Sequence, residues 1–386
     1  MRSDEAAMAE AVALGERGRL TAAPNPWVGC VVVAGGEVVG RGFHRRAGEP
    51  HAEVHALHEA GERARGATAY VTLEPCAHRG RTPPCAPALV EAGVGRVVVA
   101  VLDPDERVAG RGVALLRAAG VTVDVGAGAE AAARSLLPYL HHRRTGRPLC
   151  LLKTAASIDG RTAAADGTSQ WITGPEARAD AHRLRAESGA VVVGAGTALA
   201  DQPTLTWRNL DFDDGLVPPQ PLRVLLDAGG RVPPAGPLFD ASLAPTLVVT
   251  TAAADVETRR EWKEAGAEVE EVAPAAAAGA GGVDLLAALD VLGRRGVLQA
   301  MVEGGATVHG ALLAAGLADR IVLYTGGLVL GDEGAPLLRG SGPSTLDEAS
   351  RWRLTAVRRL GDDARLDWEP VHPRNLGDSP ASRKGL

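Results

Sequence analysis

The segment AYVTLEPCAHRGRTPPC, residues 69–85, decides the fold of the first part of the chain. Its first five residues form a short apolar run, which predicts a buried strand that ends at Pro75-Cys76. Cys85 follows after eight intervening residues and begins a predicted helix over 85–92. The two cysteines thus fit the two ends of a strand-to-helix connection, where backbone N–H groups help to keep thiolates ionised.

A histidine and a glutamate lie upstream, in His51-Ala52-Glu53, directly after Pro50. Proline is favoured at or just before a helix start. His51 and Glu53 would lie about 200° apart around a regular helix, so we expect them in its first turn, His51 at the entrance and Glu53 across the pocket. One imidazole and two thiolates fill three corners of a tetrahedral Zn²⁺ site and leave the fourth open for water.

This ordered set predicts a zinc-dependent deaminase. His51, Cys76 and Cys85 would be the metal ligands, and Glu53 would carry protons to the ring nitrogen and the leaving amine. His55 also invites a metalloprotease interpretation, but that motif needs glutamate directly after the first histidine, where this chain has Ala52.

Composition limits the other classes of function. The 386 residues exceed the usual size of a single core, so two domains are expected. A net charge of −6 and only six Trp, three Tyr and three Phe argue against a nucleic-acid partner. No uninterrupted apolar run reaches about 18 residues, so no membrane span is expected. Four cysteines make no disulfide framework, which favours a reducing cytoplasm.

Alternating strands and helices indicate α/β architecture throughout. Residues 1–146 are predicted to form a three-layer α/β/α domain that ends with a helical segment over 129–144. Residues 147–370 form a second α/β domain, and the tail, residues 371–386, is expected to be disordered. Cys30 and Cys150 lie in apolar strands and are predicted core residues.

The motifs of the first half resemble the RibD (RibG) family of bifunctional riboflavin-biosynthesis deaminase/reductases. The long Thr-Pro-Pro-Cys loop before the second cysteine separates this family from cytidine and tRNA-editing deaminases, which usually have two residues between the cysteines. The stretches that carry the resemblance are Pro24-Asn25-Pro26, Val28-Gly29, His51-Ala52-Glu53, Thr72-Leu73-Glu74-Pro75-Cys76 and Thr82-Pro83-Pro84-Cys85.

The resemblance implies a cytidine-deaminase-like domain that deaminates 2,5-diamino-6-ribosylamino-4(3H)-pyrimidinone 5′-phosphate. Asn25, His44, His78 and Thr82 would then surround this substrate. Asparagine can pair with a base edge through its donor and acceptor, and histidine can meet a phosphate. Two alternatives stay open by the sequence alone: Asn25 could merely shape a turn between its two prolines, and His78 could be a solvated loop residue.

The second half resembles the reductase domain of the same family, which has a dihydrofolate-reductase-like α/β fold. The matching stretches include Ser169-Gln170-Trp171, Gly194-Ala195-Gly196-Thr197 and Val302-Glu303-Gly304-Gly305. The resemblance implies NADPH as the cofactor, held by Ala156, Trp171, Thr197, Asp201, Gly304 and Gly305. It implies that Ser169, Arg185, Leu205, Arg208 and Glu303 line a ribose-phosphate substrate. Separately from the resemblance, we expect a homo-oligomer.

Part of this interpretation rests on elementary chemistry. Gly304-Gly305 lies between a predicted strand and helix, where backbone N–H groups and the helix dipole suit a phosphate. The first strand of this half lacks G-x-G-x-x-G after it, which disfavours a Rossmann domain. Three alternatives stay open at this point: a deaminase with a scaffolding second half, an editing deaminase fused to an unrelated reductase, and a zinc-stabilised binding module.

Overall fold

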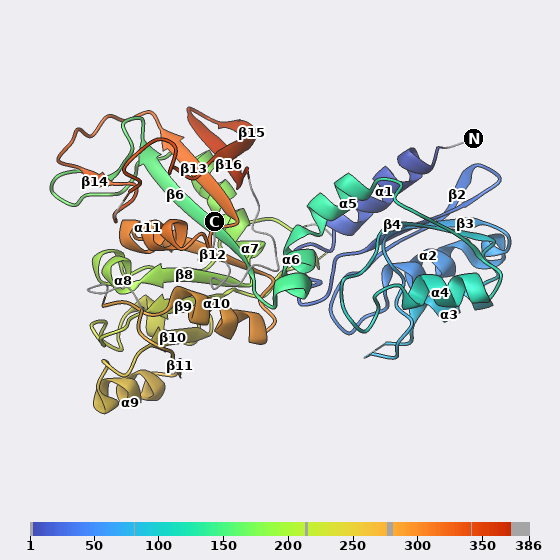
Figure 1. The fold of residues 1–386 in the computed structure, drawn as a ribbon, viewed down its shortest axis with the longest axis horizontal. Coiled ribbons are helices and arrows are strands. Elements are labelled where there is room, and N and C mark those ends of the chain that lie inside the picture. The colour runs from blue at the N-terminus through green and yellow to red at the C-terminus, as the bar shows by residue number, and fades with distance from the viewer. Residues whose placement is uncertain (1–2, 81, 213–214, 276–280, 341, 372–386) are drawn as a thin grey trace. The chain divides into compact units, whose positions relative to one another are not determined.

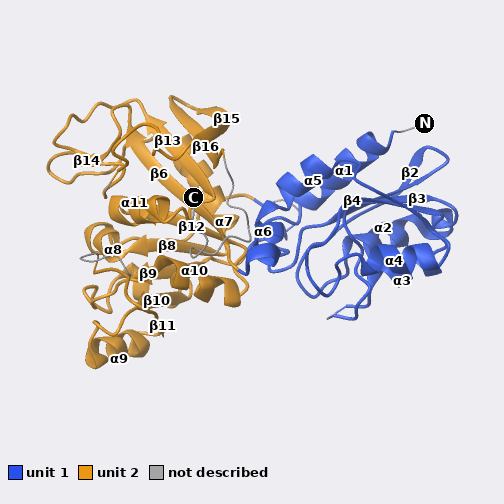
Figure 2. Cartoon of the chain, in the orientation of Figure 1, with its two compact units in different colours: residues 1–146, 212–218 blue, residues 147–211, 219–386 orange. Residues whose placement is uncertain are grey.

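The computed structural model describes residues 3–80, 82–212, 215–275, 281–340 and 342–371. The tail predicted to be disordered lies, from residue 372 onward, outside them. The chain divides into two compact units, residues 1–146 with 212–218 and residues 147–211 with 219–386 (Figure 2). The inclusion of 212–218 in the first unit is not visible in the linear sequence. Within the described ranges, no helix has the length and apolar character needed to span a bilayer.

The first unit contains one sheet and six α-helices among its described residues. Its elements are α1 (Asp4–Glu16), β1 (Gly29–Ala34), β2 (Glu37–Phe43), α2 (Ala52–Ala60), η1 (Gly61–Ala64), β3 (Thr68–Leu73), α3 (Cys85–Glu91), β4 (Arg96–Val101), α4 (Arg111–Ala118), β5 (Thr122–Val125), α5 (Ala129–Ser135) and α6 (Leu137–Thr145).

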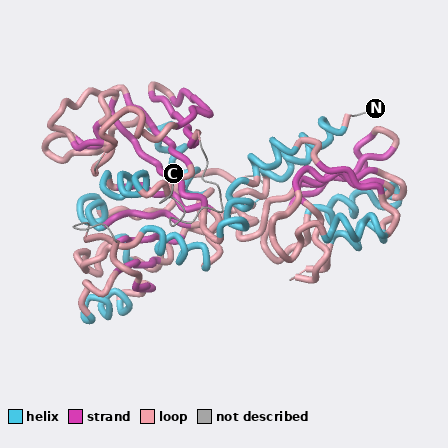
Figure 3. Tube along the Cα trace, viewed as in Figure 1, coloured by secondary structure: helices cyan, strands magenta, loops and turns pink. Residues whose placement is uncertain are grey.

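The sheet of the first unit runs in the order β2-β1-β3-β4-β5, with β3, β4 and β5 parallel. Alternate side chains of each strand point to opposite faces. Val97 and Val99 of β4 pack with α2, α3 and α4, whereas Val98 packs with α1 and α5 on the other face. Figures 1 and 3 show helices on both sides of this sheet. The prediction of three layers is therefore confirmed.

The prediction that residues 129–144 are helical is confirmed, but the segment is not continuous. The structure has α5 and α6 with a break at Leu136. Pro138 explains the break, because it has no N–H to donate and its ring clashes with the carbonyl four residues earlier. The new helix places Pro138 in its first turn, where proline is tolerated.

The second unit is built around a nine-stranded sheet. Its elements are β6 (Leu149–Ser157), β7 (Arg161–Ala163), α7 (Pro175–Ala186), β8 (Ala190–Gly194), α8 (Ala195–Asp201), β9 (Leu222–Leu226), η3 (Pro237–Phe239), β10 (Thr246–Thr250), α9 (Val256–Glu264), β11 (Glu268–Glu271), α10 (Leu285–Arg294), β12 (Gln299–Gly304), α11 (Ala306–Ala314), β13 (Arg320–Gly326), β14 (Ala335–Pro336), β15 (Trp352–Leu360) and β16 (Asp363–Pro370).

The sheet order is β11-β10-β9-β8-β12-β6-β13-β16-β15. Its strands are parallel from β11 to β13, and β16 and β15 complete it as an antiparallel hairpin. One face packs against α10 and α11, and the other against α7, α8 and α9. Cys30 and Cys150 are fully buried in the two units, as predicted.

The parallel order aligns three carboxyl ends. Strands β8, β12 and β6 are neighbours, so the segments that follow Val193, Glu303 and Ala156 meet at one edge of the sheet. Open parallel α/β sheets bind ligands outside the carboxyl ends of their strands. The fold therefore gathers at this edge segments that are far apart in sequence.

Candidate active sites

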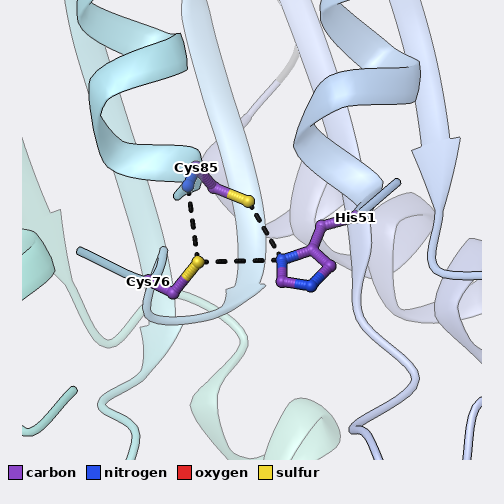
Figure 4. A group of neighbouring side chains, drawn as sticks. All are labelled: His51, Cys76 and Cys85. Carbon is purple, nitrogen blue, oxygen red and sulfur yellow. Dashed lines mark hydrogen bonds between the residues drawn. The ribbon is translucent and has the colours of Figure 1, made fainter. Parts of the chain in front are cut away.

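Three potential metal ligands converge in the first unit. His51 is the N-cap of α2, Cys85 is the first residue of α3, and Cys76 lies on the loop after β3 (Figure 4). The Nδ1 atom of His51 is 3.1 Å from the Cys85 Sγ atom and 3.7 Å from the Cys76 Sγ atom. The extended backbone of His51, with ψ of 169°, puts its ring at the helix entrance.

This spacing fits zinc. Tetrahedral Zn²⁺ with bonds of about 2.3 Å to sulfur and about 2.05 Å to nitrogen separates a nitrogen from a sulfur ligand by about 3.6 Å. The two nitrogen–sulfur distances bracket that value, and all three ligand atoms lie within 4.8 Å of one another. Among the described residues this is the one group of three or more histidine, cysteine and acidic side chains with metal-binding geometry.

The electrostatics of the cluster suit a cation. The hydrogen bond with Cys85 and the one with His51 lower the pKa of the Cys76 thiol despite its partial burial. The backbone N–H of Cys85 also donates to the Cys76 sulfur at 3.4 Å. The contact with Cys76, together with burial, raises the pKa of Cys85. The lowered pKa of Cys76 favours its thiolate form, which is the form that binds a cation, and a bound cation would also displace a proton from Cys85.

Glu53 lies in the first turn of α2, where the sequence placed it, and is 3% exposed. Burial raises the pKa of its carboxyl group, although the nearby His51 opposes the shift. A carboxyl group with a raised pKa is suited to exchange protons near neutral pH.

A second histidine lies beside the cluster. The rings of His44 and His51 are edge to face, with centroids 5.1 Å apart. The Asn25 amide nitrogen is 3.1 Å from His44 Nε2, and His44 Nδ1 is 3.2 Å from the Pro50 carbonyl. Because that carbonyl can only accept, Nδ1 carries the proton and Nε2 accepts from the Asn25 amide. Burial lowers the pKa of His44, consistent with this neutral form.

Thr82 and His78 come from the loop between the cysteines. The Thr82 hydroxyl is 3.1 Å from His51 Nε2, the ring nitrogen that faces away from the sulfurs. Such a contact fixes the ring orientation of a metal-ligating histidine. His78 is half-buried, and its Nδ1 atom is buried without a hydrogen-bond partner in the described part of the chain.

The second site lies at the carboxyl edge of the nine-stranded sheet. Thr197 is in α8 directly after β8, and Gly304-Gly305 joins β12 to α11. A Cβ atom on Gly305 would lie 2.9 Å from the Thr197 hydroxyl, so the two segments touch and a side chain at position 305 would force the Thr197 side chain to shift. Ala156 is near the end of the neighbouring β6 and is buried.

A buried ion pair lies next to this edge. The Arg185 guanidinium donates to the two carboxylate oxygens of Glu303 at 2.5 and 2.8 Å and to the Thr206 carbonyl at 2.8 Å. The side chains are 15% and 10% exposed. Burial alone would raise the pKa of Glu303, but the charges of Arg185 and Lys153 outweigh it and lower the pKa to about 2.

The remaining predicted residues differ in exposure. Trp171 is 60% exposed and lies under the Arg178 guanidinium, 4.5 Å from the ring centroid. Asp201 and Arg208 are exposed, and Ser169 is half-buried. Leu205 is instead 1% exposed, with its side chain in the core between α8 and the sheet. A ligand could therefore meet Leu205 only through its backbone.

The sequence did not single out His182. Burial and the charges of Arg185 and Arg208 lower the pKa of His182 to about 4, so it is neutral beside these groups. Its Nδ1 atom is buried and lacks a hydrogen-bond partner in the described ranges. The spacing of residues could have indicated a role for His182. It precedes Arg185 by three residues on the same helix, so the two side chains lie on one helix face.

Comparisons with known proteins agree with the presence of two different sites in the two units. Residues 1–101 match the model of the cytidine and deoxycytidylate deaminase zinc-binding region, and residues 148–366 match that of the RibD C-terminal domain. The riboflavin biosynthesis protein RibD of Chlamydia muridarum is 46% identical over 94% of this chain and 96% of its own length.

Solved structures extend the match to the fold. A RibD structure from Acinetobacter baumannii has a TM-score of 0.86 and 40% identity, covering 96% of this chain and 99% of that one. A diaminohydroxyphosphoribosylaminopyrimidine deaminase/5-amino-6-(5-phosphoribosylamino)uracil reductase from Thermotoga maritima has a TM-score of 0.80 and 31% identity, covering 95% and 98%. With both family models, near-complete coverage and two matching folds, the chain belongs to the RibD family and is a bifunctional deaminase and reductase of riboflavin biosynthesis.

Proposed function

We propose that the first unit deaminates 2,5-diamino-6-ribosylamino-4(3H)-pyrimidinone 5′-phosphate. The second unit then reduces the ribosyl group of 5-amino-6-(5-phosphoribosylamino)uracil to ribityl. The observation that carries the proposal is the convergence of His51, Cys76 and Cys85 beside the buried Glu53. The order of the two reactions follows from their chemistry, because the product of the first reaction is the substrate of the second.

In the deaminase site, His51 Nδ1 and the two cysteine sulfurs would hold zinc. The metal would supply a Lewis acid that makes water nucleophilic at neutral pH. Glu53 would accept a proton from that water and deliver protons to the ring nitrogen and the departing amine. Its raised pKa supports this role, because the group must both take up and release a proton.

The base and phosphate of this substrate would be held by Asn25, His44, His78 and Thr82. The Asn25 amide uses one N–H on His44, which leaves a second N–H and its carbonyl oxygen to pair with a base edge. The Nδ1 atom of His78 has no hydrogen-bond partner among the described residues, which supports a contact with a ligand. Thr82 would hold the His51 ring as well as line the pocket.

In the reductase site, Ala156, Trp171, Thr197, Asp201, Gly304 and Gly305 would hold NADPH. The cofactor supplies the hydride that reduces C1′ of the ribose. The start of α11 leaves backbone N–H groups free to meet a phosphate, and the lack of a side chain at Gly305 lets this turn lie directly on the Thr197 hydroxyl.

The ribose phosphate would lie against Ser169, Arg185, Arg208, Glu303 and the backbone of Leu205. Arg185 already gives three N–H donors to Glu303 and Thr206, so we assign it mainly to orienting the Glu303 carboxylate. The exposed Arg208 is better placed to grip phosphate oxygens through its guanidinium fork.

We also propose that the enzyme is a cytoplasmic homo-oligomer. Two thiolate ligands favour a reducing compartment. The edge strand β15 exposes Leu354 by 42% and Val357 by 62%, which supports a contact with a second copy of the chain.

A coupled assay tests the two-step function. Zinc-loaded protein is given the diaminopyrimidine ribosyl phosphate, and ammonia release and NADPH oxidation are followed together. Both signals are expected, with ammonia first. Ammonia without NADPH oxidation would contradict the reductase assignment, and neither signal from folded, zinc-bound protein would contradict the substrate.

A further inference from the structure

Glu74 is a buried acidic residue to which neither reaction assigns a role. It lies between β3 and Pro75-Cys76 and is 4% exposed. Its carboxylate accepts hydrogen bonds from the backbone N–H groups of Gly110 and Gly112, both at 2.9 Å, and of Val113 at 3.2 Å. A fourth N–H, that of Asp103, lies at 3.4 Å. A buried carboxylate with this many donors is held in one place.

Three of these donors belong to the start of α4. The first N–H groups of a helix have no partner within the helix, and the N-cap side chain usually supplies one. The N-cap of α4 is Gly110, which has no side chain and has a φ of 84°. The first turn of α4 also contains no acidic residue. Glu74 therefore caps α4 from a segment 36 residues earlier, and its negative charge lies at the positive end of the helix dipole.

A close backbone contact tightens the same junction. A Cβ atom on Gly112 would lie 1.8 Å from the Pro75 carbonyl oxygen and 3.3 Å from the Glu74 Cγ atom. Only glycine therefore lets α4 lie directly on the peptide group that joins Pro75 to Cys76. On its other side, Cys76 is held by α3, because its carbonyl accepts the Ala86 N–H at 3.0 Å. The metal-ligand loop is thus fixed between the starts of two helices.

We propose that Glu74, by capping α4, is a positioning residue that sets the place of the Cys76 sulfur and so raises zinc affinity. The inference rests on the zinc ligand set proposed above. Two thiolates and an imidazole must be held at about tetrahedral spacing before the metal arrives, and Cys76 itself lies in neither a helix nor a strand that would hold it. Groups outside the ligand shell commonly change metal affinity about 10- to 100-fold when mutated.

The test is Glu74→Gln in the full-length chain. Glutamine has the same size and shape as glutamate, but one of the two carboxylate oxygens is replaced by an NH₂ group. That group is a donor and cannot accept from the backbone N–H groups of α4, so the helix loses part of its cap. We expect the zinc Kd, measured by competition with a chromophoric chelator, to rise about 10- to 100-fold. The sulfur-to-metal absorption of the Co²⁺-substituted protein should also change. Glu106→Gln is the matched control, since it removes the same charge from an exposed side chain near α4 and should leave the zinc Kd unchanged.

A second variant covers the case in which Glu74→Gln fails to fold. Glu74→Asp keeps the charge but withdraws the carboxylate by one methylene, so it should fold and show a smaller rise in zinc Kd. If either folded variant binds zinc within twofold of the parent and keeps the parent Co²⁺ spectrum, the positioning role is wrong, even if thermal stability falls. Failure of the proposed ligand set would look different, because the parent itself would then bind no stoichiometric zinc.

Discussion

Replacing Arg185 by methionine should destabilise the second unit strongly. The substitution keeps an apolar stem of similar length but leaves the Glu303 carboxylate buried without its partner. The gap between the ordinary pKa of 4.5 and the folded pKa of about 2 converts to about 3 kcal/mol, at ~1.36 kcal/mol per pKa unit. Breaking one side of a buried pair typically costs about 3–5 kcal/mol, which agrees.

The pH dependence of this loss has a definite sign. In the parent, the pKa of Glu303 is lowered on folding, so the stabilisation is complete above pH 4.5 and disappears as the pH falls toward 2. In Arg185→Met, burial without the guanidinium should raise the pKa of Glu303, so this variant gains stability as acid neutralises the carboxyl group. The stability difference should therefore be larger at pH 7 than at pH 5.

Urea unfolding followed by tryptophan fluorescence measures this difference. Trp27 is the one tryptophan of the first unit, and the other five of six lie in the second, so the signal reports mainly on the second unit. Arg183→Met is the matched control, because Arg183 lies on the same helix, is 63% exposed and pairs with Glu187 at 3.7 Å. Such a surface pair contributes at most about 0.5 kcal/mol. Equal losses in the two variants at pH 7 would refute the reasoning.

Further predictions separate the two reactions. Glu53→Gln should lower the rate of ammonia release at least about 100-fold while the supplied deaminated intermediate is still reduced, because only the proton carrier is lost; loss of both activities would contradict two independent sites. Arg208→Ala should raise the KM for the reductase substrate about tenfold and leave ammonia release unchanged, since a surface phosphate grip is removed. Gly305→Ala should raise the KM for NADPH about tenfold, because its Cβ atom would lie 2.9 Å from the Thr197 hydroxyl; an unchanged KM would exclude this turn from the cofactor site.

Much of the fold could be predicted because its signals are local. The limits of β4, β9 and β10 match the mainly apolar runs in the sequence, since a strand that is covered on both faces of its sheet is mostly apolar. Ser3 caps α1 as its residue type predicts, accepting the N–H of Ala6. The β15–β16 hairpin was not predicted, because polar and apolar residues are interspersed along both strands and neither has a continuous apolar run.

The sequence by itself determined the chemistry of the first site. Histidine, glutamate and two cysteines in this order and spacing leave few alternatives to a zinc-dependent deaminase, because ligand type and coordination number select the metal. It also indicated which edge of the second sheet carries the reductase site, since glycines directly after apolar strands mark places where the backbone must approach another group.

Only the tertiary structure decided which side chains meet. It placed the Asn25 amide on His44, paired Arg185 with Glu303 and buried the Leu205 side chain in the core. It also put the Glu74 carboxylate on a helix that begins 37 residues later, at Arg111. Such contacts depend on the sheet order and on how closely two backbones pack, and neither is encoded in the local pattern of residues around any one of them.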